Sequence, residues 1–213
     1  MFKEGPMNNN IDIEDRVLII AEIGVNHEGD YSRAAEMIEL AAKSGADAVK
    51  FQTYIPESYI STSQKERLER VRGFSLSFDE FRNLASKAKE ENVLFLSTPL
   101  DLESLDLINE ISLIIKISSG DINNGPLLEK TSATGKTVIM STGLSTVEEI
   151  ERAITSLKKG NPVIIADRKL ILLHCIAAYP APEEEANLLS IPYMQEEFGV
   201  PVGYSDHTKG LLA

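Results

Sequence analysis

The chain alternates short, apolar, β-branched runs with longer segments in which apolar residues recur at helical spacing. Seven such runs each end in polar or charged residues: 17–26, 47–53, 93–99, 113–121, 137–143, 170–180 and 200–207. Strands that alternate with helices predict a parallel sheet of βα units. Polar residues gathered at the C-terminal ends of many strands are typical of a TIM-type (β/α)8 barrel with its active site on that face. A closed barrel has eight strands, so the pattern predicts an α/β barrel truncated after its seventh strand.

The length fits a single, incomplete barrel domain. The chain has 213 residues, whereas a complete barrel of this kind usually needs about 250. No repeat, low-complexity segment or linker divides it, so one domain over 1–213 is predicted. The segment 54–76 is long for a βα loop, whose usual length is about 2–6 residues. It is expected to pass over the strand ends and to hold some helix within 64–71.

Capping signals predict where helices begin and end. Ser77 with Glu80, and Ser145 with Glu148, have the spacing of a capping box, and Gly160 is expected to close the second of these two helices. Helical periodicity predicts further helices over 32–44 (with Gly45 just after its end), 101–111 and 127–133.

Composition excludes some classes of protein. A net charge of −12 argues against a surface for nucleic acid or for an anionic membrane, because either would need a basic patch. A single cysteine, Cys175, excludes an intramolecular disulfide and fits a reducing compartment. The N-terminal region lacks the apolar core of a signal peptide, and no apolar run approaches the length of a membrane span. A cytoplasmic location is expected.

Two lysines at strand ends are candidate anion ligands. Lys50 and Gln52 end the second run, and they share a face because residues two apart in a strand point the same way. Lys116 ends the fourth run. Two lysines in one barrel mouth could hold a phosphate or carboxylate, helped by the hydroxyls of Thr98, Ser119, Ser141 and Ser205. The alternative for each lysine is a solvated or ion-paired cation.

Two further polar residues could take part in catalysis. Glu22 lies inside an apolar run, where a carboxylate is costly to bury unless it is paired or functional. It could be a general base, or it could form a salt bridge to one of the lysines. His207 follows the last run and could bind a metal with Asp206 as its supporting partner, although a lone histidine is more often structural.

Other motifs do not support a site. Residues 132–137 end like a phosphate-binding P-loop, but Lys130 stands where that motif requires glycine. His174 and Cys175 are adjacent in a strand and must face opposite sides. Cys175 is therefore expected to be a buried structural thiol.

Taken together, these segments resemble the sialic acid synthase (N-acetylneuraminate synthase) family. The matching stretches run in order from Leu18 onward: AEIGVNHEGD, GADAVKFQT, STPLD, IKISSGD, MSTGLS, HCIAAYPAPEEEANL and GYSDHTKG. The sixth of them is similar to the branch associated with spore-coat polysaccharide synthesis. The family condenses phosphoenolpyruvate with an N-acetylated hexose such as N-acetylmannosamine, and the products are a nonulosonic 2-keto acid and phosphate.

The resemblance implies a role for each candidate residue. Lys50, Thr98, Lys116, Ser119, Ser141 and Ser205 match positions around phosphoenolpyruvate. Glu22, Gln52, Asp121 and Tyr179 match positions near the sugar and the reaction centre. His207 matches one of two histidines that bind a divalent metal, usually Mn²⁺, which polarises the sugar aldehyde.

Three departures from the family pattern bear on whether these roles apply to this chain. Ala177 stands where a serine or asparagine usually helps to hold the phosphate, and Asp121 replaces the usual glutamate. Both changes suggest a different substrate, without implying that the site is inactive. The third departure is the absence of the eighth strand, with its second metal histidine, and of the C-terminal antifreeze-like domain that builds the homodimer. We therefore expect weak metal binding and little activity from these 213 residues alone.

Two other functions stay open at this point. One is a Schiff-base aldolase that uses Lys116 or Lys50 as nucleophile. The other is a non-catalytic barrel remnant that pairs with another subunit through its open edge.

Overall fold

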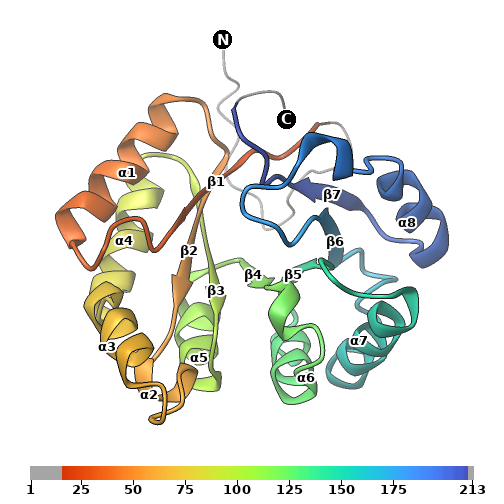
Figure 1. The fold of residues 1–213 in the computed structure, drawn as a ribbon, viewed down its shortest axis with the longest axis horizontal. Coiled ribbons are helices and arrows are strands. Elements are labelled where there is room, and N and C mark those ends of the chain that lie inside the picture. Colours follow the sequence, from red (N-terminus) through yellow and green to blue (C-terminus); the bar gives the residue numbers. More distant parts are fainter. Residues whose placement is uncertain (1–15, 211–213) are drawn as a thin grey trace.

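The seven predicted strands form one curved, parallel sheet. A computed structural model describes residues 16–210. The sheet order is β1-β2-β3-β4-β5-β6-β7, so that each strand pairs with its neighbours in the chain (Figure 1). The strands are β1 (Ile20–Gly24), β2 (Ala48–Thr53), β3 (Leu94–Pro99), β4 (Ile114–Ile117), β5 (Thr137–Ser141), β6 (Leu170–Cys175) and β7 (Val202–Ser205). This is the predicted α/β barrel through its seventh strand.

Helices cover the outer side of the sheet (Figure 1). They are α1 (Tyr31–Lys43), α2 (Pro56–Tyr59), α3 (Lys65–Phe74), α4 (Phe78–Glu90), α5 (Leu102–Ile111), α6 (Gly125–Ala133), α7 (Val147–Gly160) and α8 (Ser190–Phe198). Two single 3₁₀ turns, η1 (Ser119–Asp121) and η2 (Glu183–Glu185), follow β4 and β6. The segment 54–76 holds α2 and α3, which agrees with the helix expected there. The pattern analysis did not predict α8.

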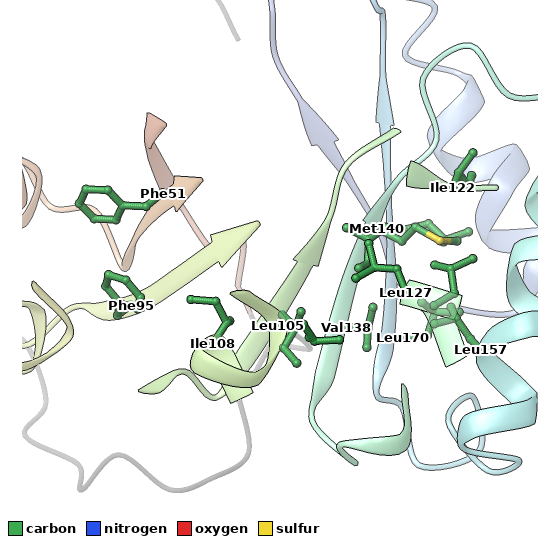
Figure 2. Packing of buried hydrophobic residues seen from close by; sticks show 14 of the residues in the cluster. Phe51, Phe95, Leu105, Ile108, Ile122, Leu127, Val138, Met140, Leu157 and Leu170 are labelled. Atoms are coloured by element: carbon green, nitrogen blue, oxygen red, sulfur yellow. The ribbon is translucent and has the colours of Figure 1, made fainter. Parts of the chain in front are cut away.

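Buried apolar residues form two layers, one on each side of the sheet. The larger layer lies between strands and helices and contains Phe51, Phe95, Leu105, Ile108 and Met140 (Figure 2). Phe51 stacks on Phe95 with ring centroids 5.5 Å apart. The smaller layer is the barrel interior, made by Ala48, Leu96, Ile114, Ile139 and Ile171. This second layer identifies which strand positions point inward.

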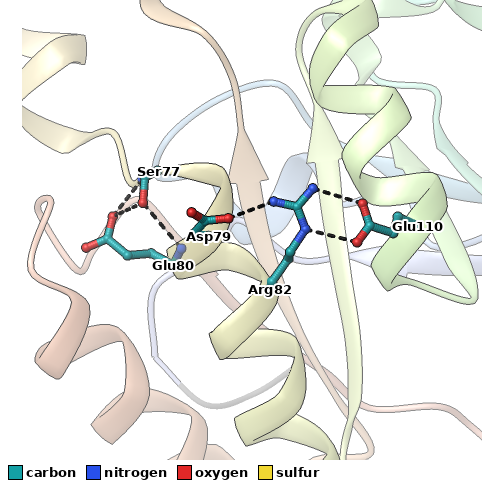
Figure 3. A network of polar contacts seen from close by, with 5 residues as sticks. All are labelled: Ser77, Asp79, Glu80, Arg82 and Glu110. Atoms are coloured by element: carbon teal, nitrogen blue, oxygen red, sulfur yellow. Dashed lines mark hydrogen bonds and ion pairs between the residues drawn. The ribbon is translucent and has the colours of Figure 1, made fainter.

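One capping prediction is confirmed and one is wrong. Ser77 caps α4, and Glu80 completes the box by accepting a hydrogen bond from the Ser77 backbone (Figure 3). In the same helix Arg82 bridges Asp79 and Glu110, which ties α4 to α5 (Figure 3). For α7, however, the cap is not Ser145.

The cap of α7 lies one residue later than the spacing suggested. Thr146 accepts a hydrogen bond from the backbone of Glu149, whose side chain bonds back to the Thr146 backbone. Ser145 and Thr146 are both hydroxyl residues three positions before a glutamate, so the sequence offers two registers. The helix begins at Val147, so Thr146, with the extended backbone of a cap, is the residue just before it.

Gly160 does not end α7 as a capping glycine. It is the last residue of the helix, and the cap is Asn161. A side chain at position 160 would lie 2.1 Å from the backbone oxygen of Glu129 and 2.2 Å from the Ser132 hydroxyl. Glycine is therefore needed here because α6 and α7 touch backbone to backbone. Gly45, by contrast, follows α1 with φ of +89°, as predicted for a residue just past a helix end.

Membrane spans were sought in residues 16–210. No helix in this part of the chain is both long and apolar enough to cross a bilayer.

Candidate active site at the carboxyl ends of the strands

The barrel interior determines which polar side chains meet at the mouth. Side chains alternate along a strand, so a residue two positions after an interior one faces inward too. Four candidate residues follow interior positions in this way: Lys50 after Ala48, Thr98 after Leu96, Lys116 after Ile114 and Ser141 after Ile139. Gln52 follows two positions later still. Five of the predicted residues thus share one face, near the ends of four consecutive strands.

Lys116 is the most buried charged residue of this group. Only 4% of it is exposed, and its ammonium donates to the Ser141 hydroxyl at 2.6 Å and to the Ile117 carbonyl at 2.7 Å. Burial lowers the pKa of Lys116 to about 8, while the charges of Cys175 and Asp121 act in the opposite direction. An anion placed here would remove much of the cost of burying this charge.

Lys50 belongs to a second group at the ends of β1 and β2. It faces Glu22, the residue opposite it in the sheet register, and the two form an ion pair. Burial, and then the charge of Lys116, lower the pKa of Lys50 to about 7; the contact with the Glu22 carboxylate opposes this shift. The salt bridge left open as an alternative for Glu22 is therefore present in the structure.

Gly24 brings the Glu22 and Gln52 side chains together. A β-bulge between Glu22 and Gly24 shifts the register of β1, and Gly24 has φ of +55°. A side chain at position 24 would lie 3.0 Å from the Glu22 carboxylate and 3.7 Å from the Gln52 amide nitrogen. Any other residue would therefore be strained here and would crowd the Glu22 carboxylate.

Besides Thr98, three more predicted residues lie on or after strand ends. Thr98 is 4% exposed and pairs in register with Gln52. Ser205 pairs in register with Cys175. Ser119 and Asp121 lie in the 3₁₀ turn η1, where the Asp121 carboxylate accepts a hydrogen bond from Ser118 at 2.5 Å. That bond fixes the orientation of the Asp121 carboxylate, whose side chain is shorter than the glutamate usual in the family.

His207 and Tyr179 form a third group, after β7 and β6. Their rings lie 4.1 Å apart, centroid to centroid. Nδ1 of His207 is 2.6 Å from the Ile176 carbonyl. Because a carbonyl can only accept, Nδ1 carries the proton and Nε2 keeps its lone pair for another partner.

The geometry of His207 fits one ligand of a divalent metal. Metal-binding histidines usually donate their second ring nitrogen to a carbonyl or carboxylate, and His207 does so. Among residues 16–210 no group of three or more His, Cys, Asp or Glu side chains is arranged to hold a metal ion. His207 could thus supply one ligand, and the remaining ligands would have to come from elsewhere.

Cys175 is the mouth residue that sequence reasoning missed. It is buried, as expected, but it lies four positions after interior Ile171 and therefore faces the mouth. His174 faces the helices, where Nε2 is 2.7 Å from the Ala186 carbonyl. Alternation along the strand predicts only that His174 and Cys175 face opposite sides of β6. The position of Ile171 in the interior layer shows that Cys175 is the one that points inward. Ala177, in the loop after β6, has no side-chain donor to offer.

Comparison with known proteins places the chain in a family. The NeuB family model matches residues 37–213. The chain belongs to the NeuB family. Among its relatives, the N,N'-diacetyllegionaminic acid synthase of Campylobacter jejuni is 43% identical over 210 residues, which cover 92% of this chain and 62% of that protein.

Solved structures agree with this family. The N-acetylneuraminic acid synthetase of Leptospira borgpetersenii, in complex with citrate, superposes with a TM-score of 0.86 at 38% identity, covering 99% of this chain and 71% of that one. The spore coat polysaccharide biosynthesis protein of Bacillus subtilis superposes with a TM-score of 0.77 at 33% identity, covering 90% and 53%. The chain spans little more than half the length of the first curated relatives it matches, from 56% to 62%.

Proposed function

We propose that this chain forms the substrate-binding barrel of a nonulosonic acid synthase, which condenses phosphoenolpyruvate with an N-acetylated hexose. The observation that carries the proposal is the pair of inward-facing lysines, Lys50 and Lys116. Burial lowers the pKa of both, so each gains from a nearby anion. Phosphoenolpyruvate offers a phosphate and a carboxylate to such a pair.

The hydroxyls near these lysines would complete the anion site. Ser141 already contacts Lys116, and Ser119, Thr98 and Ser205 lie on or after neighbouring strand ends. In this proposal Lys116 and Ser141 hold the phosphate. Lys50 exchanges its contact with Glu22 for the bound anion, and Glu22 is thereby released to face the sugar.

The reaction joins two carbons and removes phosphate. C3 of phosphoenolpyruvate attacks the sugar aldehyde carbon, and the aldehyde oxygen takes a proton to become a hydroxyl. Water then adds at C2, and cleavage of the C–O bond gives the 2-keto acid and inorganic phosphate. Glu22, Gln52 and Tyr179 would orient the sugar and the water. A divalent metal, Mn²⁺ in our proposal, would be held in part by His207 and would polarise the aldehyde as a Lewis acid.

The identity of the sugar is part of the proposal. Two relatives are named for N,N'-diacetyllegionaminic acid, so a hexose with two N-acetylated amines is the first acceptor to test beside N-acetylmannosamine. Asp121 is one methylene shorter than the glutamate usual at this position, and Ser118 holds it in the turn. The shorter acid leaves more room beside the sugar.

Calorimetric titration with phosphoenolpyruvate tests the anion site directly. We expect Lys116→Ala to weaken binding at least tenfold, because charge-assisted hydrogen bonds contribute about 1.5–3 kcal/mol each. The matched control is Lys159→Ala, since Lys159 pairs with Glu129 on the outer helices. Equal affinity in wild type and Lys116→Ala, or no binding to the wild type, would contradict the proposal.

The lowered pKa of the lysines also supports a second candidate function. A lysine that is uncharged near neutral pH can act as the nucleophile of a Schiff-base aldolase. Borohydride would then trap a carbonyl substrate covalently on Lys50 or Lys116. The synthase proposal expects no trapping, and it expects activity to be lost with chelators.

A further inference from the structure

Cys175 lies in the wall of the proposed anion site, although no role in the reaction accounts for it. It ends β6, faces the mouth and is 6% exposed. In the sheet register it pairs with Ser205, and residues paired in neighbouring parallel strands face the same side. The thiol therefore lies among the hydroxyls that we assign to the phosphate.

The Cys175 sulfur and the Ser119 hydroxyl both lie close against Gly143. A side chain at position 143 would lie 2.9 Å from the sulfur and 3.4 Å from the Ser119 oxygen. No other side-chain atom is among the three nearest heavy atoms at this point. The sulfur thus occupies the volume that a larger residue at position 143 would need.

Lys116 lies on the same inward face as Cys175 and is a cation with bonding capacity left. An ammonium group has three donors, and Lys116 uses two of them within the described residues, on Ser141 and on the Ile117 carbonyl. The charge of a Cys175 thiolate would act on Lys116, so the two groups are within electrostatic reach. The third donor of this buried ammonium, unused within residues 16–210, is therefore free to bond to an anion that enters the site.

We propose that Cys175 is a positioning residue of the anion site, whose thiol packs against Gly143 near Ser119, on the inward face that carries Lys116, and so limits the room left there for the phosphate. Occupation by the anion and covalent modification of the thiol then exclude each other. A purely structural thiol would instead fill the barrel wall, and its reactivity would not change when the ligand binds. The inference rests on the proposed function, since it takes phosphate to be the anion.

Replacing the thiol tests its effect on affinity. Calorimetry with phosphoenolpyruvate compares wild type with Cys175→Ser and Cys175→Val, and thermal unfolding confirms that each variant is folded. We expect the small hydroxyl of Cys175→Ser to keep affinity within about threefold. The branched side chain of Cys175→Val should project into the phosphate space and weaken binding at least tenfold. Wild-type affinity in Cys175→Val would overturn the inference.

Thiol labelling gives a readout that a structural role would not move. The chain has one cysteine, so a small alkylating reagent such as iodoacetamide reports on Cys175 alone. At a phosphoenolpyruvate concentration ten times its Kd, labelling should slow about tenfold, in proportion to the free fraction. In Lys116→Ala, whose affinity should be at least tenfold lower, the same concentration should slow labelling by no more than about twofold. The fully labelled chain should be folded but should not bind phosphoenolpyruvate.

The two experiments separate this inference from the proposed function. One outcome is that phosphoenolpyruvate binds in a Lys116-dependent manner, yet leaves the labelling rate of Cys175 unchanged and binds Cys175→Val as tightly as wild type. In that case the proposed role of the thiol is wrong and the proposed function stands. If phosphoenolpyruvate does not bind the wild type, the proposed function fails first. Should the thiol be too buried to react, the affinity comparison decides alone.

Discussion

Lys116 donates a 2.6 Å hydrogen bond to the hydroxyl of Ser141 on the neighbouring strand, in a part of the barrel wall where the lysine is only 4% exposed. The bond satisfies one donor of a charge that has little access to water. It does not offset the cost of burial, since the pKa of Lys116 falls to about 8. A lysine buried under these conditions lowers the stability of the fold while no anion is bound. This cost is expected of a residue whose proposed role is to bind an anion.

Lys116→Met should therefore raise the free energy of unfolding at pH 7 while abolishing phosphoenolpyruvate binding. A pKa lowered from 10.5 to about 8 corresponds to a gain of up to about 3 kcal/mol. The folded pKa lies below the unfolded value, so wild-type stability rises with pH between about 8 and 10.5. The advantage of the variant should shrink over that same window, as measured by urea unfolding at several pH values. A variant less stable than wild type at pH 7 would contradict this expectation.

His27 should make stability sensitive to acid. It is 1% exposed, and its Nε2 has no hydrogen-bond partner among the described residues. Burial is the largest cause of its lowered pKa, ahead of the opposing charge of Glu80. Stability from this group is complete above the unfolded value of 6.5 and is lost as the pH falls through the lower folded value.

The variant His27→Gln isolates this effect. Glutamine can still accept the hydrogen bond that the Gly29 backbone donates to Nδ1, but it does not titrate. Thermal unfolding at pH 7.5 and pH 5 should show a smaller drop for His27→Gln than for wild type. Equal drops in the two proteins would assign the acid sensitivity to other groups.

The cap of α7 can be distinguished from its neighbour by two alanine variants. Thr146→Ala removes the side chain that accepts from the Glu149 backbone, and it should cost about 1 kcal/mol of unfolding free energy. Ser145→Ala should cost less than about 0.5 kcal/mol, since it removes no cap. Chemical denaturation of both variants measures the free energy of unfolding and shows which residue caps α7. A larger loss of unfolding free energy in Ser145→Ala would favour Ser145, the cap first expected from the sequence.

Two glycines in helices should respond in opposite directions to alanine. Gly160→Ala places a methyl group 2.1 Å from the Glu129 carbonyl oxygen, so α6 and α7 must separate, at a cost of about 1–3 kcal/mol. Gly73→Ala, in α3, meets nothing within 4 Å and should gain about 0.5–1 kcal/mol from helix propensity. Melting temperatures of the two variants test this pair. A neutral Gly160→Ala would mean that the helices move apart easily.

The sequence predicted most of the fold because its signals are local. Apolar runs located all seven strands, and the Ser77–Glu80 box located the start of α4. Local signals failed where two choices look alike along the chain. Ser145 and Thr146 offer equal caps, and Gly160 is near a helix end for a reason that lies in α6.

For the candidate site, sequence patterns identified the residues but not their contacts. Lys50, Thr98, Lys116 and Ser141 were found because each is a polar residue towards the end of an apolar run, and they do face one side. The partner of Glu22 and the direction of Cys175 depend on how strands align, which no single segment encodes. α8 was missed because it is short, its apolar residues show weak helical periodicity, and a proline, Pro192, stands in its first turn. The chemical roles of the site residues remain predictions.

The strictly consecutive strand order divides the mouth into a central and a peripheral half. Lys116, Ser141 and Cys175 come from β4, β5 and β6, a continuous middle stretch of the chain, whereas Glu22 and His207 come from near its two ends. Under the proposed function, changes at Glu22 or beside His207 can therefore alter the acceptor half of the mouth while Lys116, Ser141 and Cys175 stay in place. A search for variants that accept new aldehydes can then be confined to the end of β1 and to the residues just after β7, with Lys50, Ser205 and the middle of the chain left unchanged.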